Sequence, residues 1–90
     1  MREITILRTD DWTPAVMTVE IDGQACAILS PGEKRSIPID EGSHSLKIVC
    51  EDHAGRKYFS ELRPIVPSNY SPSYRAKLTL LSRKVELERA

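Results

Sequence analysis

The sequence holds none of the short signatures by which many enzymes are recognised. It has no GxSxG nucleophile elbow, no glycine-rich phosphate loop, no HExxH zinc motif and no CxxC pair. The only histidines are His44 and His53, and no close pair of ligands anchors a zinc site that would join them to Cys26 and Cys50. We therefore expect a protein that is not an enzyme and that uses no cofactor and no metal.

The chain also lacks an excess of charge and any long apolar run. Its 13 basic and 13 acidic residues give a formal net charge of zero, so no overall field favours nucleic acid or an anionic membrane. Apolar runs fall far short of the about 20 residues that a spanning helix needs. Acidic residues interrupt the one basic stripe, which consists of Arg75, Lys77, Arg83 and Lys84. We expect a solvated face there, no nucleic-acid partner and no membrane insertion.

The first residues, MREITILRTDDW, lack the apolar core of a secretory signal. This predicts a cytoplasmic protein. In that compartment Cys26 and Cys50 are expected to be buried, reduced thiols that act as small apolar side chains. In an exported chain the same two residues would instead suit a single disulfide.

The chain does contain strong turn signals flanked by alternating apolar residues. Asp22-Gly23 predicts a two-residue hairpin, because both central positions of a type I′ turn need positive φ. Pairing across this turn sets Ile21 opposite Gln24, Val19 opposite Cys26 and Met17 opposite Ile28. Directly opposed residues share a face of the sheet. One apolar face is therefore expected to hold Met17, Val19, Ile21, Cys26 and Ile28.

Similar signals recur along the whole chain and predict an all-β fold. A Pro-Gly turn is expected at 30–33, and Pro38 indicates an edge strand because proline cannot donate to a ladder. Residues 63–73 suit an extended crossover between sheet edges, and residues 82–90 fit a strand better than a short helix. All four glycines fall at proposed turns. Further strands are expected at 3–9, 34–39, 44–50, 57–62 and 74–80. We predict one domain over residues 1–90, a single antiparallel β-sandwich of about seven strands, immunoglobulin-like in architecture.

Residues 18–48 carry two short patterns, xVxIDGxxxxxL and then xxGxHxLxI. The matching residues are Val19, Ile21, Asp22, Gly23 and Leu29, followed by Gly42, His44, Leu46 and Ile48. Over this third of the chain the sequence resembles PEGA-type and related small β-sandwich repeats. The resemblance implies a non-enzymatic accessory or interaction module of the kind often attached to surface or cell-envelope proteins.

The function favoured by this sequence is binding or assembly without catalysis. Such a module would present a sheet edge or face to a protein partner or to a second copy. The surfaces predicted for this contact are an exposed edge that carries Arg35, Ile37 and Ile39, and a loop that carries Tyr70 and Tyr74.

An alternative hypothesis is a carbohydrate-binding module built on exposed aromatic rings. It would use Trp12, Tyr70 and Tyr74 together with Asp10 or Asp11. Trp12 is open to two interpretations, since a tryptophan after a first strand more often covers one end of a core than serves as a sugar platform.

Overall fold

The structure, a computed structural model, describes residues 2–10, 15–67, 71–79 and 81–90. The described residues form strands joined by turns and loops, and none of them is helical. The chain is therefore all-β, as the turn signals predicted. The strands are β1 (Arg2–Arg8), β2 (Val16–Ile21), β3 (Gln24–Leu29), β4 (Lys34–Ile39), β5 (His44–Glu51), β6 (Lys57–Phe59), β7 (Arg63–Ile65), β8 (Ser73–Thr79) and β9 (Lys84–Arg89).

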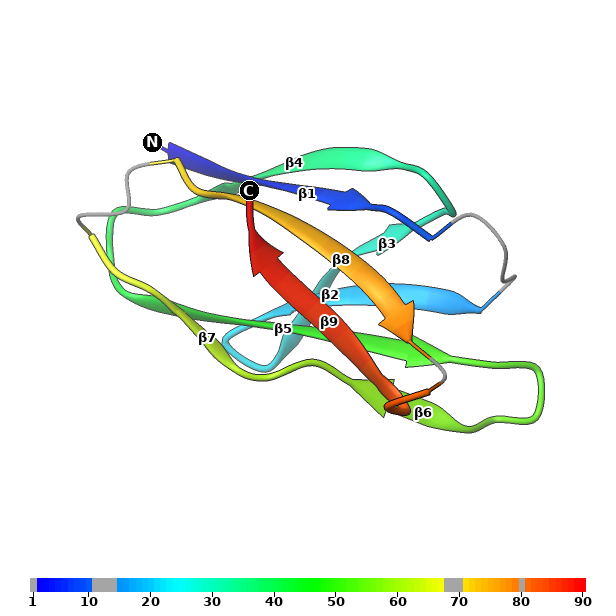
Figure 1. The fold of residues 1–90 in the computed structure, drawn as a ribbon. Helices are drawn as coiled ribbons and strands as arrows, with labels where there is room; N and C mark the ends of the chain where they lie inside the picture. The colour runs from blue at the N-terminus through cyan, green and yellow to red at the C-terminus, as the bar shows by residue number, and fades with distance from the viewer. Residues whose placement is uncertain (1, 11–14, 68–70, 80) are drawn as a thin grey trace.

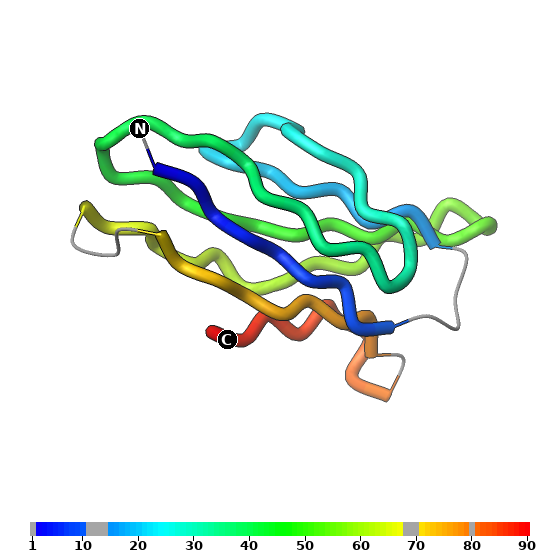
Figure 2. Tube along the Cα trace, turned by 90° about the horizontal axis from the view of Figure 1, so that it is seen from above, coloured from blue at the N-terminus to red at the C-terminus, as the bar shows by residue number. Residues whose placement is uncertain are grey.

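The strands form two sheets that pack face to face (Figure 1). The first sheet has the order β4-β1-β8-β9. The second has the order β3-β2-β5-β6, and β7 also pairs with β5 beside β6. Seen from above, β1 and β8 lie on one side of the molecule and β2 and β5 on the other (Figure 2). This two-layer arrangement confirms the predicted sandwich.

Two details differ from the expected sandwich. The prediction of about seven strands missed that residues 57–65 contain two separate short strands, β6 and β7. The sandwich is also not wholly antiparallel, because β1 and β8 pair in parallel. The crossover through 63–73 is the reason: it carries the chain from β7 in the second sheet to β8 in the first, which then runs in the direction of β1.

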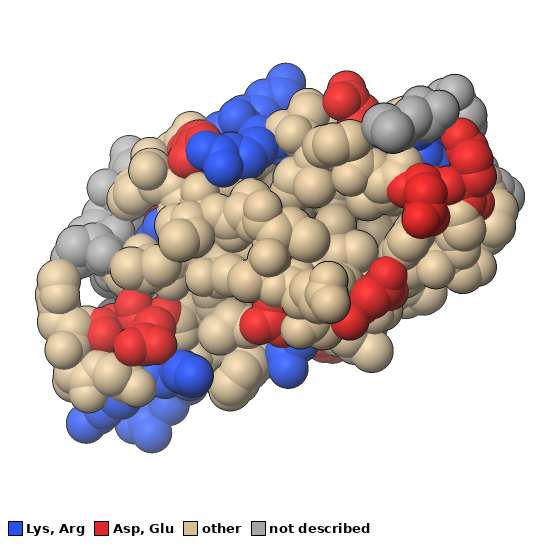
Figure 3. Space-filling view, turned by 180° about the vertical axis from the view of Figure 1, so that it is seen from behind, with Lys and Arg blue, Asp and Glu red and all other residues tan. Residues whose placement is uncertain are grey.

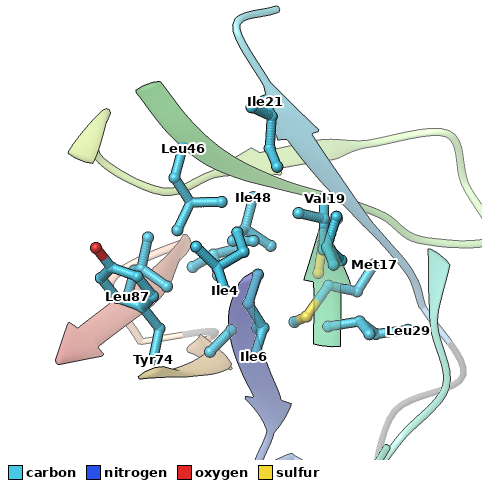
Figure 4. Packing of buried hydrophobic residues seen from close by; sticks show 14 of the residues in the cluster. Ile4, Ile6, Met17, Val19, Ile21, Leu29, Leu46, Ile48, Tyr74 and Leu87 are labelled. Atoms are coloured by element: carbon cyan, nitrogen blue, oxygen red, sulfur yellow. The ribbon is translucent and has the colours of Figure 1, made fainter. Parts of the chain in front are cut away.

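The core lies between the sheets and comes from every second residue of the long strands. Ile4 and Ile6 of β1 point toward Val19 of β2 and Ile48 of β5, and all four are fully buried (Figure 4). Burying an aliphatic side chain of this size contributes about 1.5–3 kcal/mol relative to leaving it in water. The period-two pattern of the sequence therefore positions the core directly.

The Asp22-Gly23 hairpin forms as predicted. Asp22 and Gly23 have φ values of 54° and 81°, which are the positive values that this turn requires, and Ile21 pairs with Gln24. The predicted register then fails two residues further on. Glu20 pairs with Ala25 but Val19 pairs with Ala27, so the register shifts by one residue in β3.

This β-bulge corrects the predicted apolar face. The extra residue reverses the alternation in β3, so that Leu29 faces the core while Ile28 is 58% exposed. Cys26 is exposed as well, whereas Cys50 on β5 is buried as predicted. Both cysteines are free, in agreement with the thiol interpretation. The remaining members of the predicted face, Met17, Val19 and Ile21, are buried.

The turn at 30–33 and the edge position of β4 are also confirmed. Gly32 has a φ of 76°, and the Glu33 amide donates to the Ser30 carbonyl at 2.9 Å. β4 pairs with β1 and lies at the end of the first sheet, where Pro38 costs no ladder bond to a second neighbour.

The C-terminal half departs from its prediction over residues 57–65, where the expected strand at 57–62 is shorter and the expected crossover at 63–73 begins with strand β7. β6 ends at Phe59. At the next residue the Ser60 amide still donates to the Ile48 carbonyl at 2.9 Å, but the Ile48 amide donates to the Ser60 hydroxyl at 2.9 Å instead of to a backbone carbonyl. Leu62, at the end of the predicted strand, lies outside β6 and is 65% exposed. The tail is a strand, and a turn at 81–83 with Arg83 at φ 53° sets Val85 opposite Leu78. That turn explains why the buried residues occupy even positions in β8 and odd positions in β9.

A buried arginine fastens one end of the sandwich. Arg2 is 2% exposed, and its guanidinium donates to the carbonyls of Asp40 at 3.1 Å and Val66 at 2.9 Å, and to that of Gly42. The first strand thus holds both the β4–β5 loop and the segment after β7, and it satisfies carbonyls that have no ladder partner.

Candidate functional site

The outer faces of the two sheets differ in character. On the first sheet, Arg75 lies opposite Glu88 and Lys77 opposite Glu86 across β8 and β9. The Arg75 guanidinium lies 3.6 Å from the Glu88 carboxylate, and both side chains are more than half exposed. Cross-strand pairs of opposite charge on an exposed face are typical of a surface that stays in water.

The outer face of the second sheet carries a row of uncharged side chains that crosses four strands. Ile28 of β3 pairs with Thr18 of β2, Thr18 pairs with Val49 of β5, and Val49 pairs with Phe59 of β6. We call these four residues the apolar row. Ile28 is 58% exposed and Phe59 is 47% exposed, and Thr18 and Val49 are half-buried between them. Val16, two residues before Thr18 on β2, adds an exposed side chain to the same face.

Charged residues border the apolar row. Glu20 pairs with Lys47 on one side, and Glu51 pairs with Lys57 on the other. The Lys47 ammonium lies 4.6 Å from the centre of the Phe59 ring, a cation–π contact that holds the ring on the face. Viewed from behind, this face is mainly uncharged, with most of its acidic and basic groups toward the rim (Figure 3). A shallow groove on this face is lined by Val16 and Thr18 of β2, Val49 and Glu51 of β5 and Lys57 of β6.

One edge of this sheet carries neither charge nor proline. Sheet edges expose unpaired backbone groups, and proteins commonly guard them with charges, proline, very short strands or a β-bulge such as the one in β3. β4 contains Lys34, Arg35 and Pro38, β9 is dominated by charged residues, and β6 and β7 have three residues each. β3 has the sequence QACAIL, with neither charge nor proline, and among the described strands it pairs with β2 alone.

The apolar row begins on this uncharged edge, at Ile28. A second shallow depression there is lined by Thr18, Cys26, Ala27 and Ile28 of the second sheet and by Arg35 of β4. Arg35 is exposed, and its guanidinium donates to the Glu33 carboxylate at 2.7 and 3.0 Å. Edge and row together therefore offer backbone hydrogen-bonding groups beside apolar side chains.

A histidine between two carboxylates joins two turns at one end of the molecule. His44 opens β5, and its Nδ1 lies 2.6 Å from Oδ2 of Asp22 while its Nε2 lies 2.6 Å from Oδ1 of Asp40. The second carboxylate oxygen of Asp22 accepts the Ser45 amide at 2.9 Å, and Asp40 accepts the Gly42 amide at 3.1 Å. Each ring nitrogen already has a carboxylate partner, so His44 serves as a link between turns and is not placed to act as a base.

The electrostatics of this cluster favour the charged forms. Hydrogen bonds to Asp22 and Asp40 raise the pKa of His44 above its usual value. The bond with His44 lowers the pKa of Asp22, and the bond from the Gly42 amide, followed by that from His44, lowers the pKa of Asp40. Sequence reasoning placed His44 at a strand start, but no local spacing indicates that residues 22 and 40 meet there.

Most residues of the predicted contact surfaces lie elsewhere than expected. Tyr74 is 5% exposed and packs in the core, with the Arg89 guanidinium 6.0 Å from its ring centre, because even positions of β8 face inward. Ile37 and Ile39 are each 7% exposed, because the odd positions at the end of β4 face inward. Of the predicted edge side chains only Arg35 is accessible. Trp12, Tyr70 and Asp11 lie outside the described residues.

The remaining polar candidates are structural in character. Asp10, considered as a carbohydrate ligand, is buried and bound to Arg8. Burial raises the pKa of the Cys50 thiol to about 11, so it stays protonated and unreactive at neutral pH. Within the described part of the chain, no group of three or more His, Cys, Asp or Glu side chains is arranged to hold a metal ion.

Comparisons with known proteins found no match among protein-family models, curated proteins or solved structures. The resemblance to PEGA-type modules therefore stays a prediction. Within the described residues, there is no helix of the length and apolarity that crossing a membrane requires.

Proposed function

We propose that this chain is a non-catalytic protein-binding module whose contact surface is the outer face of the second sheet together with the β3 edge. The observation that supports this most is the contrast between the two outer faces. One has cross-strand ion pairs such as Arg75 with Glu88, and the other has the apolar row. The fold requires apolar residues only between the sheets, so a row of them on the outside calls for another explanation.

Two physical properties make this surface suitable for protein partners. Exposed apolar side chains such as Ile28 and Phe59 release water when a partner covers them, which drives association. The β3 edge adds backbone donors and acceptors that an extended segment can pair with, the mode of recognition known as β-augmentation. Glu20, Lys47, Glu51 and Lys57 would form the polar rim that surrounds the apolar part of many interfaces.

The carbohydrate-binding alternative has less support. Tyr74, one of its three aromatic residues, is buried and cannot stack on a sugar ring. Asp10 is buried in an ion pair with Arg8. The protein-binding function therefore has the stronger support.

The test uses peptides selected from a displayed random library for binding to the folded chain. We expect selected peptides to lose about tenfold or more in affinity for Ile28→Lys and for Phe59→Ala, because each change removes an exposed apolar anchor. Ser36→Lys is the matched control, since residue 36 is exposed on a strand of the first sheet. Thermal unfolding should show that all three variants remain folded.

Two results would contradict the proposal. One is a library that yields no binder to the wild-type chain. The other is a set of binders whose affinity falls as much for Ser36→Lys as for Ile28→Lys, because such peptides would not use the second sheet.

A further inference from the structure

We infer that the β3 edge pairs with β3 of a second copy of this chain, antiparallel and about a two-fold axis, so that two second sheets join into one. This inference rests on the proposed function and names the partner. It follows from the charge, the symmetry and the side-chain pattern of β3 itself.

The strand is compatible with its own copy because it carries no charge itself, and Arg35 of β4, which lies beside it, is paired with Glu33. When a strand pairs with its own copy, residues near the axis face the same residues or their close neighbours, so any charge there meets a like charge. β3 consists of Gln24, Cys26 and four small or aliphatic residues, so no like charges on the two strands repel each other. At β4, by contrast, Pro38 would interrupt the ladder between two copies. Lys34 and Arg35 would also approach the basic residues of the other copy if the pairing register were displaced from the centre of the strand.

The symmetry also extends the apolar row. A two-fold axis perpendicular to the sheet keeps the outer faces of both copies on the same side. Ile28 of each copy then lies close to the axis, and the row from Phe59 to Ile28 continues into the row of the second copy. Exposed apolar surface that ends abruptly at an edge in one copy thus becomes the middle of a larger face.

Long-range electrostatics and chain size are consistent with this pairing. The formal net charge is zero, so two copies do not repel at a distance. A chain of 90 residues buries a smaller fraction of its surface on folding than a larger domain, so burial between copies adds to a modest core.

Cys26 gives the pairing a direct chemical readout. It is the third of the six residues of β3 and is exposed. With the axis near Ala27, Cys26 of one copy lies opposite Ile28 of the other, so the two Cys26 residues are one diagonal apart, a separation of roughly 7–8 Å. Cys50 is buried with a raised pKa and should not react.

The experiment combines sedimentation of the full chain with a short bis-maleimide, which joins two thiols by addition to its two double bonds. We expect a dimer whose fraction rises with concentration, and cross-linking of the wild type but not of Cys26→Ser. Ser36→Cys in the Cys26→Ser background is the matched control and should cross-link several-fold less, because residue 36 lies on the first sheet. Ile28→Lys should raise the dimer dissociation constant at least tenfold.

Failure of this inference differs from failure of the proposed function. A wild-type chain that stays monomeric to about 1 mM, or that cross-links through Ser36→Cys as efficiently as through Cys26, overturns the second copy as partner. If displayed peptides still bind the second sheet in that case, the module binds other proteins. If neither peptides nor a second copy use this surface, both proposals fail.

Discussion

At the scale of single residues, the feature that most restricts which residue types the fold accepts is the ion pair of Arg8 and Asp10. Both side chains are fully buried, and two nitrogens of Arg8 donate to Oδ2 of Asp10 at 3.1 and 3.0 Å. Arg8 also donates to the Leu29 carbonyl at 2.9 Å, and Asp10 accepts the Leu78 amide at 3.2 Å. The pair therefore connects β1 with β3 of the opposite sheet and with β8 of its own sheet.

Breaking this pair should be costly. Arg8→Met leaves a buried carboxylate without its counter-charge, so we expect a loss of about 3–5 kcal/mol in the free energy of unfolding. Asp10→Asn should also destabilise, but the double variant should lose less than the sum of the two, because no isolated charge remains. Urea unfolding at pH 7 measures all three. Additive losses, or a loss below about 1 kcal/mol for Arg8→Met, would show that the two charges are not coupled.

Residue identities also show where prediction from sequence stops. Period-two burial correctly placed Met17, Val19 and Ile21, because polar Thr18 and Glu20 between them fix the phase. It failed for Cys26 and Ile28, because residues 25–29 are all apolar and fit either face of a sheet. The β-bulge decides which of these side chains face the core, and an all-apolar run contains no sequence signal for its position.

At the scale of elements, the His44 cluster ties the β2–β3 turn to the loop between β4 and β5. His44 contacts Asp22 in the first and Asp40 in the second, and its side chain is only 13% exposed. These segments belong to strands of both sheets, so the link should help to hold the sandwich together at this end.

The cluster predicts a dependence of stability on pH. The pKa of His44 is raised above 6.5 in the folded chain, so its contribution is complete below pH 6.5 and is lost as the pH rises through the folded value. The pKa values of Asp22 and Asp40 are lowered below 3.8, so their contributions are present above that pH and are lost as the pH falls further. Between these limits the cluster should stabilise the fold most.

Thermal unfolding from pH 5 to 9 measures the part of this dependence that comes from His44. His44→Asn should flatten the decline in melting temperature above pH 6.5, whereas His53→Asn, an exposed loop residue, should keep the wild-type profile. Equal profiles for wild type and His44→Asn would refute the role of the cluster.

Elements with a local signal were predicted well. The turn at Asp22-Gly23, the turn at 30–33 and strand β5 all follow from residue types that admit few other conformations. β6 and β7 were missed as separate strands, because three residues show no periodicity. The meeting of residues 22, 40 and 44 depends on how hairpins dock, which no local pattern encodes.

At the scale of the whole molecule, strand order decides which outward side chains become neighbours. Ile28, Thr18, Val49 and Phe59 come from four strands, and only the order β3-β2-β5-β6 aligns them. The sequence predicted a sandwich and a binding surface at a sheet edge, but placed that surface on β4 and on Tyr74. The accessible apolar surface lies on the second sheet, with its open edge at β3.

The most direct test of this account is the change in backbone amide NMR shifts when the wild-type chain is diluted. We predict shifts in β3 and along the apolar row, at Ile28, Thr18, Val49 and Phe59, with little change at Arg75 and Lys77 on the first sheet. Shifts confined to β4, β8 or β9 would contradict the assignment of the contact surface, and spectra that do not change with concentration would contradict pairing between copies.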